Sequence, residues 1–348
     1  MNFKGHIKKI KRIDYLNYSR LNFTRLDKNE KKDDFENILI KNFEKKINSN
    51  LLSSYPEVSS LVSLISKSYK IDLKNILLTA GIDGAIKLII DALTNRGDRA
   101  IILEPTFAMT KIYCDIANLK IVSIKYDKNL RLDLKKLLDN IKKKTSIVIL
   151  SNPNSPTGTV IEEKYIFQIL NKTNKLKIPL IIDEAYIEFF GKSLISYIKK
   201  NKNLFVLRTF SKAFGLAGLR SGFIASSKNN IDYLKKFKPM YEINSIGILL
   251  TKLILENPKI VKNYVKKCFL FKNKLFTLLK KKKIKFKDTK ANFVLIEKKR
   301  IKKKIFEDCK KNKILISKKI HFEKYLRVTI GPLNKMRVFL NILNKNII

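Results

Sequence analysis

The sequence predicts an α/β protein in which a large domain, with a mostly parallel sheet between helices, is joined to a smaller α+β C-terminal domain. From about residue 75 to 226, short apolar segments alternate with segments of helical periodicity, which is typical of βαβ units. The length of 348 residues exceeds that of one typical domain, and 45% hydrophobic residues suffice for a large core. We therefore expect an N-terminal arm with part of the small domain over 1–45, the large domain over 46–255, and a bridging helix with the rest of the small domain over 256–348.

The individual elements follow from the same patterns. Strands of the large sheet are expected near 75–79, 99–103, 120–125, 146–150, 178–183, 204–208 and 221–226. Helices are expected over 82–94, 107–117, 133–143 and 161–172. A long basic helix over about 256–283 would lead to strands near 292–297, 313–317 and 325–330 and to a last helix from about 334. The first 25 residues are basic and polar, and we expect them to form an arm on a partner subunit or to be disordered.

The most informative segment is TFSKAFGLAGLR, residues 209–220, which places Lys212 directly after Ser211 and eight residues before Arg220. An amine can form a Schiff base with an aldehyde, and a hydroxyl with a guanidinium can hold a phosphate. This combination suits pyridoxal 5′-phosphate (PLP), whose enzymes need such a lysine. Lys and Arg total 74, so a lysine without these neighbours would be interpreted as a solvated surface group.

Two further segments place polar groups directly after apolar strands. Asp183 follows the apolar residues of IPLIIDEAYIEF, and a buried carboxylate there can pair with the protonated pyridine nitrogen of PLP. Tyr186 can reach the phenolate oxygen of the cofactor, and Asn152, in SNPNSPTG, can donate to the same oxygen. Taken singly, these residues also fit a helix-capping Asp, a core Tyr and a plain turn. Because ligands collect at the carboxyl ends of strands in open α/β sheets, the amide, the carboxylate and Lys212 together favour one shared site.

With these segments in place, the chain resembles the fold-type I PLP enzymes of the class I/II aminotransferases, and the histidinol-phosphate aminotransferase family in particular. The resemblance extends from about residue 26 to the end. Besides the lysine segment, its motifs are YPE at 55–57, GIDGAI at 81–86, EPTF at 104–107, NPNSPTG at 152–158, DEAYIEF at 183–189, ANF at 291–293 and LRVTIG at 326–331. The lysine segment and DEAYIEF are specific, whereas YPE and ANF alone are weak.

The resemblance implies further site residues. Asp83 and Gly84 would open a helix whose backbone N–H groups cradle the cofactor phosphate. Tyr55 is similar to a tyrosine that reaches the phosphate in the partner subunit, which implies a homodimer with shared active sites. Phe107 would stack on the pyridine ring, the alternative being a core aromatic. Arg327 is similar to the arginine that grips the acidic end of the substrate in a two-pronged fork, the alternative being a surface arginine on a strand.

The substrate is less well specified, because the chain departs from the family pattern. The family often has Asn-Glu-Asn-Pro-Tyr near the N-terminus, where this chain has Asn29 followed by Glu-Lys-Lys-Asp. A second substrate-gripping arginine is replaced by Ser317 and Lys318, and a tyrosine after EPTF is replaced by Thr110. Asn29 and Lys318 remain candidate substrate-binding residues, although lysine lacks the arginine fork.

The resemblance also implies the reaction. Lys212 would move a proton between the substrate Cα and the cofactor C4′, Asp183 would keep the ring nitrogen charged, and the kinetics would be ping-pong. Histidinol phosphate with 2-oxoglutarate is the leading substrate pair. RLDKNE (25–30) also resembles relatives that act in sugar-phosphate or phosphonate metabolism. Decarboxylation of a phosphorylated amino acid is a further alternative, since the fold determines the cofactor better than the reaction.

The net charge of +44 raises nucleic-acid binding as a different class of function. The densest basic runs are KKKIK (281–285) and RIKKKI (300–305). Lysine is nevertheless spread along the whole chain, and Asn and Ile are abundant too, so a compositional drift explains the charge. We expect no specific nucleic-acid partner, only weak adhesion that salt abolishes.

Cysteine and histidine usage argues against a metal or disulfide protein. Cys114, Cys268 and Cys309 have no CxxC spacing, and two histidines are too few for a metal site. We expect reduced, mostly buried thiols in a cytoplasmic protein. The sequence shows neither the apolar core of a signal peptide in residues 1–20 nor an apolar run long enough for a membrane helix.

Overall fold

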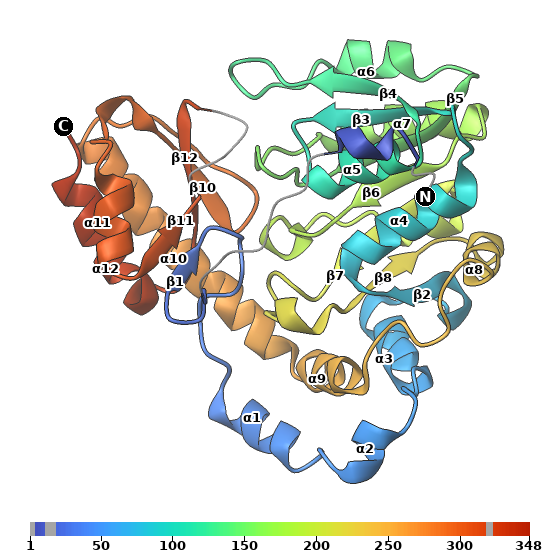
Figure 1. Cartoon of the computed structure of the whole chain (residues 1–348), viewed down its shortest axis with the longest axis horizontal. Coiled ribbons are helices and arrows are strands. Elements are labelled where there is room, and N and C mark those ends of the chain that lie inside the picture. The colour runs from blue at the N-terminus through green and yellow to red at the C-terminus, as the bar shows by residue number, and fades with distance from the viewer. Residues whose placement is uncertain (1–3, 11–18, 318–322) are drawn as a thin grey trace.

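The architecture comes from a computed structural model that describes residues 4–10, 19–317 and 323–348. Its larger part is built on a seven-stranded sheet with the strand order β2-β8-β7-β6-β5-β3-β4 (Figure 1). The strands are β2 (Ile76–Thr79), β3 (Arg99–Glu104), β4 (Lys120–Lys125), β5 (Thr145–Ser151), β6 (Leu180–Asp183), β7 (Leu204–Thr209) and β8 (Gly222–Ala225). Each lies within two residues of its predicted position, because the buried apolar segments were bounded clearly in the sequence.

The sheet is mostly parallel, as expected. Strands β4, β3, β5, β6 and β7 run parallel, whereas β8 lies between β2 and β7 and is antiparallel to both. Strands β5, β6 and β7 are direct neighbours, so their carboxyl ends meet at one edge of the sheet. The backbone N–H of Asn152 donates to the carbonyl of Asp183 at 2.9 Å, which locks two of these ends together.

Helices cover both faces of this sheet. They are α4 (Gly81–Leu93), α5 (Ala108–Ile116), α6 (Leu134–Asn140), α7 (Glu163–Lys175) and α8 (Lys228–Lys235). Side chains alternate between the faces of β3, so that Ile101 packs in one apolar cluster and Ile102 in the other. Helix α7 packs in the first cluster through Ile169, and α4 packs in the second through Ile86. The result is a three-layer α/β/α arrangement.

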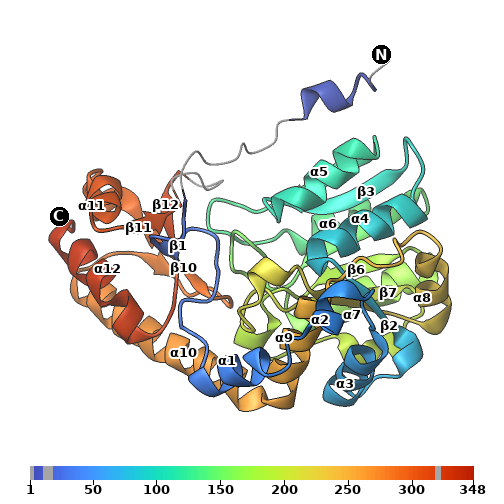
Figure 2. The same cartoon turned by 60° about the horizontal axis from the view of Figure 1, so that its bottom comes forward.

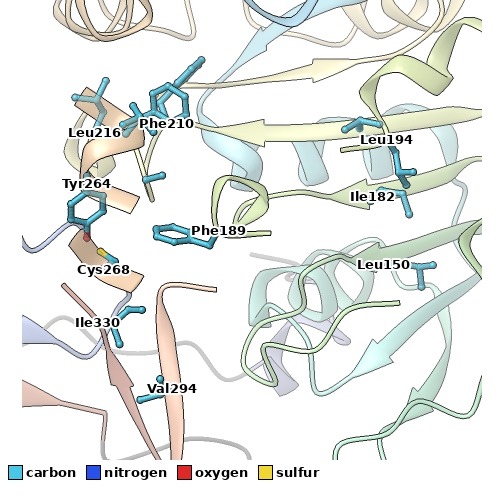
Figure 3. Packing of buried hydrophobic residues seen from close by; sticks show 14 of the residues in the cluster. Leu150, Ile182, Phe189, Leu194, Phe210, Leu216, Tyr264, Cys268, Val294 and Ile330 are labelled. Carbon is cyan, nitrogen blue, oxygen red and sulfur yellow. The ribbon is translucent and has the colours of Figure 1, made fainter. Parts of the chain in front are cut away.

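The C-terminal part forms a second layer structure beside the sheet (Figures 1 and 2). It contains a three-stranded antiparallel sheet with the order β12-β10-β9. Its elements are α10 (Pro258–Lys281), β9 (Phe286–Lys287), β10 (Phe293–Glu297), α11 (Ile305–Lys311), β11 (Ile314–Ile316), β12 (Tyr325–Thr329) and α12 (Leu333–Lys345). The first apolar cluster continues from Leu150 and Ile182 of the large sheet to Tyr264 and Val294 of this part (Figure 3).

The long basic helix predicted over 256–283 is in fact two helices. Helix α9 (Ser245–Glu256) ends at Glu256, and α10 begins at Pro258. Asn257 between them has φ −121° and ψ 63°, outside the helical region. A residue before proline is driven out of the α-helical region, and proline itself is well tolerated in the first turn of a helix. Pro258 therefore sets the break.

The N-terminal segment joins the C-terminal part. Strand β1 (Thr24–Leu26) pairs parallel with β11, although some 290 residues separate them. The arm or disorder expected for the first 25 residues therefore does not hold at Thr24 and Arg25, and residues 11–18 lie outside the described residues. A strand of three residues is too short to recognise from periodicity. The division at residues 45 and 255 remains a prediction.

The remaining elements connect these parts. The helices α1 (Asn37–Glu44), α2 (Ser49–Ser53) and α3 (Ser59–Tyr69) precede β2. Short 3₁₀ helices are η1 (Ile7–Lys9), η2 (Leu73–Asn75), η3 (Ile187–Phe189), η4 (Ile195–Lys199), η5 (Ala217–Leu219) and η6 (Lys298–Arg300). The three cysteines are buried, and in the described part of the chain no helix is long and apolar enough to cross a membrane.

Candidate active site

The shared edge of β5, β6 and β7 brings the three predicted groups together. Asn152 directly follows β5, Asp183 ends β6, and Lys212 lies in the turn after β7. Asn152 and Asp183 are buried, and Lys212 is half-buried. An amide, a carboxylate and an amine thus converge where ligands bind in open α/β sheets.

Asp183 is a buried carboxylate without a bonded cation. Its Oδ1 accepts a hydrogen bond from the backbone N–H of Ala185 at 2.9 Å, and its Oδ2 accepts one from Ser151 Oγ at 3.3 Å. Burial raises the pKa of Asp183 to about 6, although these bonds and the Lys212 cation act to lower it. A cationic ring nitrogen placed beside it would favour the ionised carboxylate. The site therefore fits a protonated pyridine ring.

Lys212 is held by the N-terminal segment. Its Nζ donates to the backbone carbonyl of Lys28 at 3.1 Å and lies 5.6 Å from the centroid of the Tyr186 ring. Gly215, in the same turn, has φ +84°, and its Cα faces the aliphatic part of Lys31 so closely that a side chain at this position would clash. The lysine turn and the segment around Lys28 therefore pack directly against each other.

Tyr186 and Asn152 offer polar groups beside Lys212. Burial acts to raise the pKa of Tyr186, but the Lys212 cation and a hydrogen bond from Asn29 outweigh it, so that the pKa is lowered overall. Asn29 Nδ2 donates to Tyr186 Oη at 3.0 Å. Asn152 Oδ1 accepts from the N–H of Ile161 at 2.9 Å, which turns its Nδ2 donor to the other side. Both residues can thus stabilise an anionic oxygen, as predicted.

The start of α4 forms a cradle with the lysine segment. Gly81 has φ +71°, and a Cβ at this residue would lie 3.2 Å from Arg220 Nη2. Asp83 and Gly84 lie in the first turn of α4, where backbone N–H groups have no partner within the helix. Ser211 is buried at the end of the neighbouring strand. Helix N–H groups, a hydroxyl and a guanidinium together fit a phosphate.

Arg327 lies on β12, at the side of the site formed by the C-terminal part. Its Nη2 donates to the carbonyl of Asp27 at 2.7 Å, and its carbon Cζ lies 5.7 Å from the centroid of the Phe293 ring. Its Nε is buried and has no hydrogen-bond partner among the described residues. Burial lowers the pKa of Arg327. A buried guanidinium N–H without an acceptor fits the binding of an anionic substrate group.

The other predicted residues take different positions. Tyr55 is 73% exposed and stacks on Tyr241 with ring centroids 4.1 Å apart. Phe107 is half-buried and packs against the second apolar cluster, to which Tyr186 also belongs. Lys318 lies outside the described residues.

The sequence profile of the family "Aminotransferase class I and II" matches residues 24–343. The chain belongs to this family. A histidinol-phosphate aminotransferase from Methanocaldococcus jannaschii is 33% identical over 307 residues, which are 84% of this chain and 82% of the relative. The chain is therefore a PLP-dependent aminotransferase.

Solved structures agree on the fold. A histidinol-phosphate aminotransferase from Sinorhizobium meliloti in complex with pyridoxal-5′-phosphate superposes with a TM-score of 0.87, covering 99% of this chain and 97% of that one at 18% identity. An L-threonine-O-3-phosphate decarboxylase from Porphyromonas gingivalis superposes with a TM-score of 0.74, covering 92% of this chain and 98% of that one at 22% identity. At these identities the likeness shows the PLP-dependent aminotransferase fold and not the substrate.

A buried ion cluster behind the aminotransferase site was not predicted. Arg208 on β7 lies 3.2 Å from Glu184 Oε2, contacts Glu188, and lies 4.8 Å from the centroid of the Tyr69 ring. Burial raises the pKa of both glutamates, and the carboxylates together raise the pKa of Arg208 against the effect of burial. The signal in the sequence was a charged residue inside the apolar strand LFVLRT, four positions before Lys212.

A second unpredicted feature fixes Asn29. Its Oδ1 accepts from Thr329 Oγ1 at 3.0 Å, its N–H donates to the same oxygen at 3.1 Å, and its carbonyl accepts from Asn292 Nδ2 at 3.0 Å. Asn29 was predicted to bind substrate, whereas in this structure its polar groups bind Tyr186 and these two residues. The motifs ANF and LRVTIG contain Asn292 and Thr329, so the signal was present without an indication of its partner.

Proposed function

We propose that this aminotransferase moves an amino group between histidinol phosphate and 2-oxoglutarate. The observation that carries the proposal is the convergence of Lys212, Asp183 and Arg327 in a chain 33% identical to a histidinol-phosphate aminotransferase over 84% of its length. The proposed phosphate cradle at the start of α4 and the buried Asp183 support the position of the cofactor.

The chain's own residues would act as follows. Bound PLP supplies an electron sink for the substrate carbanion. Asp183 holds its carboxylate at the ring nitrogen, and Tyr186 and Asn152 hold donors at the phenolate oxygen. Lys212 Nζ takes the proton from the substrate Cα and returns it on the other side of the reaction. Arg327 holds an anionic group of the substrate, exchanging its bond to the Asp27 carbonyl for that group.

The cofactor phosphate would lie at the start of α4. Backbone N–H groups of Asp83 and Gly84 would bind it together with Ser211 and Arg220. Phe107 would stack on the pyridine ring. These roles follow the positions of the residues at the carboxyl edge of the sheet.

The active unit would be a homodimer in the cytoplasm. Tyr55 is an exposed aromatic, and with Leu52, Val58, Met240 and Tyr241 it is one of several large exposed apolar side chains from two segments of the chain. Exposed apolar surface of this kind is typical of an interface. Tyr55 would complete the phosphate site of the partner subunit.

A decarboxylase remains the second candidate, because its fold is similar and the substrate-binding positions depart from the family pattern. Thr110 is buried where the family has a tyrosine, and its Oγ1 has no hydrogen-bond partner among the described residues. Lys31 stands in the run where the family has Asn-Pro-Tyr, and its Nζ binds the carbonyls of Asp33 and Asp34. These positions would seat the distal part of a substrate differently.

A half-reaction tests the proposal. The protein is loaded with PLP, and histidinol phosphate, glutamate and a panel of amino acids are added one at a time while the visible absorbance band of the cofactor is followed. Loss of this band with histidinol phosphate, and its return with 2-oxoglutarate, is the expected result. The Lys212→Ala variant, handled identically, is the matched control.

The other outcomes assign the function differently. Loss of the band only with other amines would refute histidinol phosphate and retain the aminotransferase. Release of carbon dioxide from a phosphorylated amino acid would favour the decarboxylase. A protein that binds no PLP would contradict the proposed site.

A further inference from the structure

A glutamate from a distant loop occupies the start of helix α4. Glu242 Oε1 accepts a hydrogen bond from the backbone N–H of Ala80, the N-cap of α4, at 2.9 Å. The same oxygen would lie 2.7 Å from a Cβ at Gly84. The carboxylate therefore rests on the helix turn to which Asp83 and Gly84 contribute their N–H groups.

The carboxylate is poorly neutralised. Its Oε2 is buried and has no hydrogen-bond partner among the described residues, and Lys238 Nζ, the cation paired with it, is 3.7 Å away. The side chains of Glu242 and Lys238 are only 16% and 13% exposed. A partly buried charge is screened less by water than a surface charge, so its field acts on neighbouring groups.

The absence of a side chain at Gly84 makes this contact possible. Alanine at this position would push the carboxylate away from the helix, because its Cβ would approach Oε1 too closely. Negative charge at a helix N-terminus stabilises the helix. A phosphate bound to the same turn would use the same favourable field and would be repelled by the carboxylate already present.

We propose that Glu242 is an affinity-determining residue of the cofactor site: its carboxylate supports the start of α4 without phosphate and weakens the binding of the PLP phosphate. The inference rests on the proposed location of the phosphate at Asp83, Gly84 and Arg220. The enzyme would then bind PLP more weakly than its cradle alone allows.

Replacement by glutamine isolates the charge. Glu242→Gln keeps an oxygen that can accept from the Ala80 N–H and removes the negative charge. We expect the dissociation constants of PLP and of inorganic phosphate to fall about three- to tenfold, the size of a screened charge interaction near a protein surface. Inorganic phosphate reports on the cradle without any reaction of Lys212.

The measurement is equilibrium dialysis of cofactor-free protein with PLP, and competition of inorganic phosphate against it. The chain has no tryptophan, so dialysis is preferable to intrinsic fluorescence. Glu256→Gln, at the exposed end of α9, removes one negative charge elsewhere and is the matched control, for which we expect unchanged binding. Glu242→Asp keeps the charge and withdraws it, and its affinities should lie between those of the wild type and Glu242→Gln.

The outcomes separate this inference from the proposed function. Tighter binding of both ligands by Glu242→Gln alone supports the inference. Equal or weaker binding of either ligand overturns it and makes Glu242 a purely structural support of α4. If Glu242→Gln does not fold, the affinities of Glu242→Asp decide in the same way. Wild-type protein that binds no PLP refutes the proposed function, while competition-free binding of radiolabelled phosphate still tests Glu242.

Discussion

Removal of Arg208 should destabilise the protein strongly, because it leaves two buried carboxylates without their cation. Arg208 is 6% exposed and contacts Glu184 and Glu188, whose pKa values burial already raises. Breaking a buried ion cluster by removing one partner costs about 3–5 kcal/mol. We therefore expect Arg208→Leu to lose that much free energy of unfolding.

The size of the protein sets the thermal shift. With an unfolding entropy of roughly 2.1 cal/mol/K per residue, 348 residues give about 0.7 kcal/mol/K. A loss of about 3–5 kcal/mol then lowers the apparent Tm by about 4–7 °C. Calorimetry at fixed protein and cofactor concentration measures it, and Arg337→Leu on the exposed face of α12 is the control, with an expected shift below about 1 °C.

The pH dependence gives a second, independent readout. In Arg208→Leu the folded-state pKa values of Glu184 and Glu188 rise further above their unfolded values. A group with a raised folded pKa contributes stability below its unfolded pKa and loses it as the pH rises through the folded pKa. The deficit of the variant should therefore shrink as the pH falls from 8 toward 5. A shift of less than 1 °C, or a deficit independent of pH, would refute the reasoning.

Three further variants test the site residues. Lys212→Ala should reduce amino transfer about a thousandfold and abolish the visible band of bound PLP, measured by absorbance and steady-state kinetics; retention of either contradicts its role. Asp183→Asn removes a carboxyl whose pKa is about 6 in the fold and about 3.9 in an unfolded chain. Ionisation of Asp183 thus opposes folding above pH 6, so the cofactor-free variant should be more stable than wild type at pH 8 by up to about 3 kcal/mol, and this gain should shrink as the pH falls toward 4. Equal thermal stability at both pH values would show that Asp183 is not desolvated. Arg327→Lys should raise the KM of the dicarboxylate substrate about tenfold or more with a smaller change in kcat, since an ammonium lacks the two-pronged fork; an unchanged KM would place the substrate carboxylate elsewhere.

The sequence by itself determined the fold class and the order of the chemical groups. Buried parallel strands are continuous apolar segments, so their ends were visible, and Asn152, Asp183 and Lys212 stood directly after them. The parallel neighbours β5, β6 and β7 then bring these residues to one edge. Local spacing also indicated the lysine turn, since Gly215 needs a positive φ that other residues avoid.

The tertiary structure alone decided which distant residues complete the site. The carbonyls of Asp27 and Lys28 hold Arg327 and Lys212 because β1 pairs with β11 at the other end of the chain. Glu242 meets the start of α4 across about 160 positions of sequence. Periodicity and spacing report contacts within one element or between adjacent ones. Contacts made by loop closure across the fold leave no local pattern, so only the packed chain reveals them.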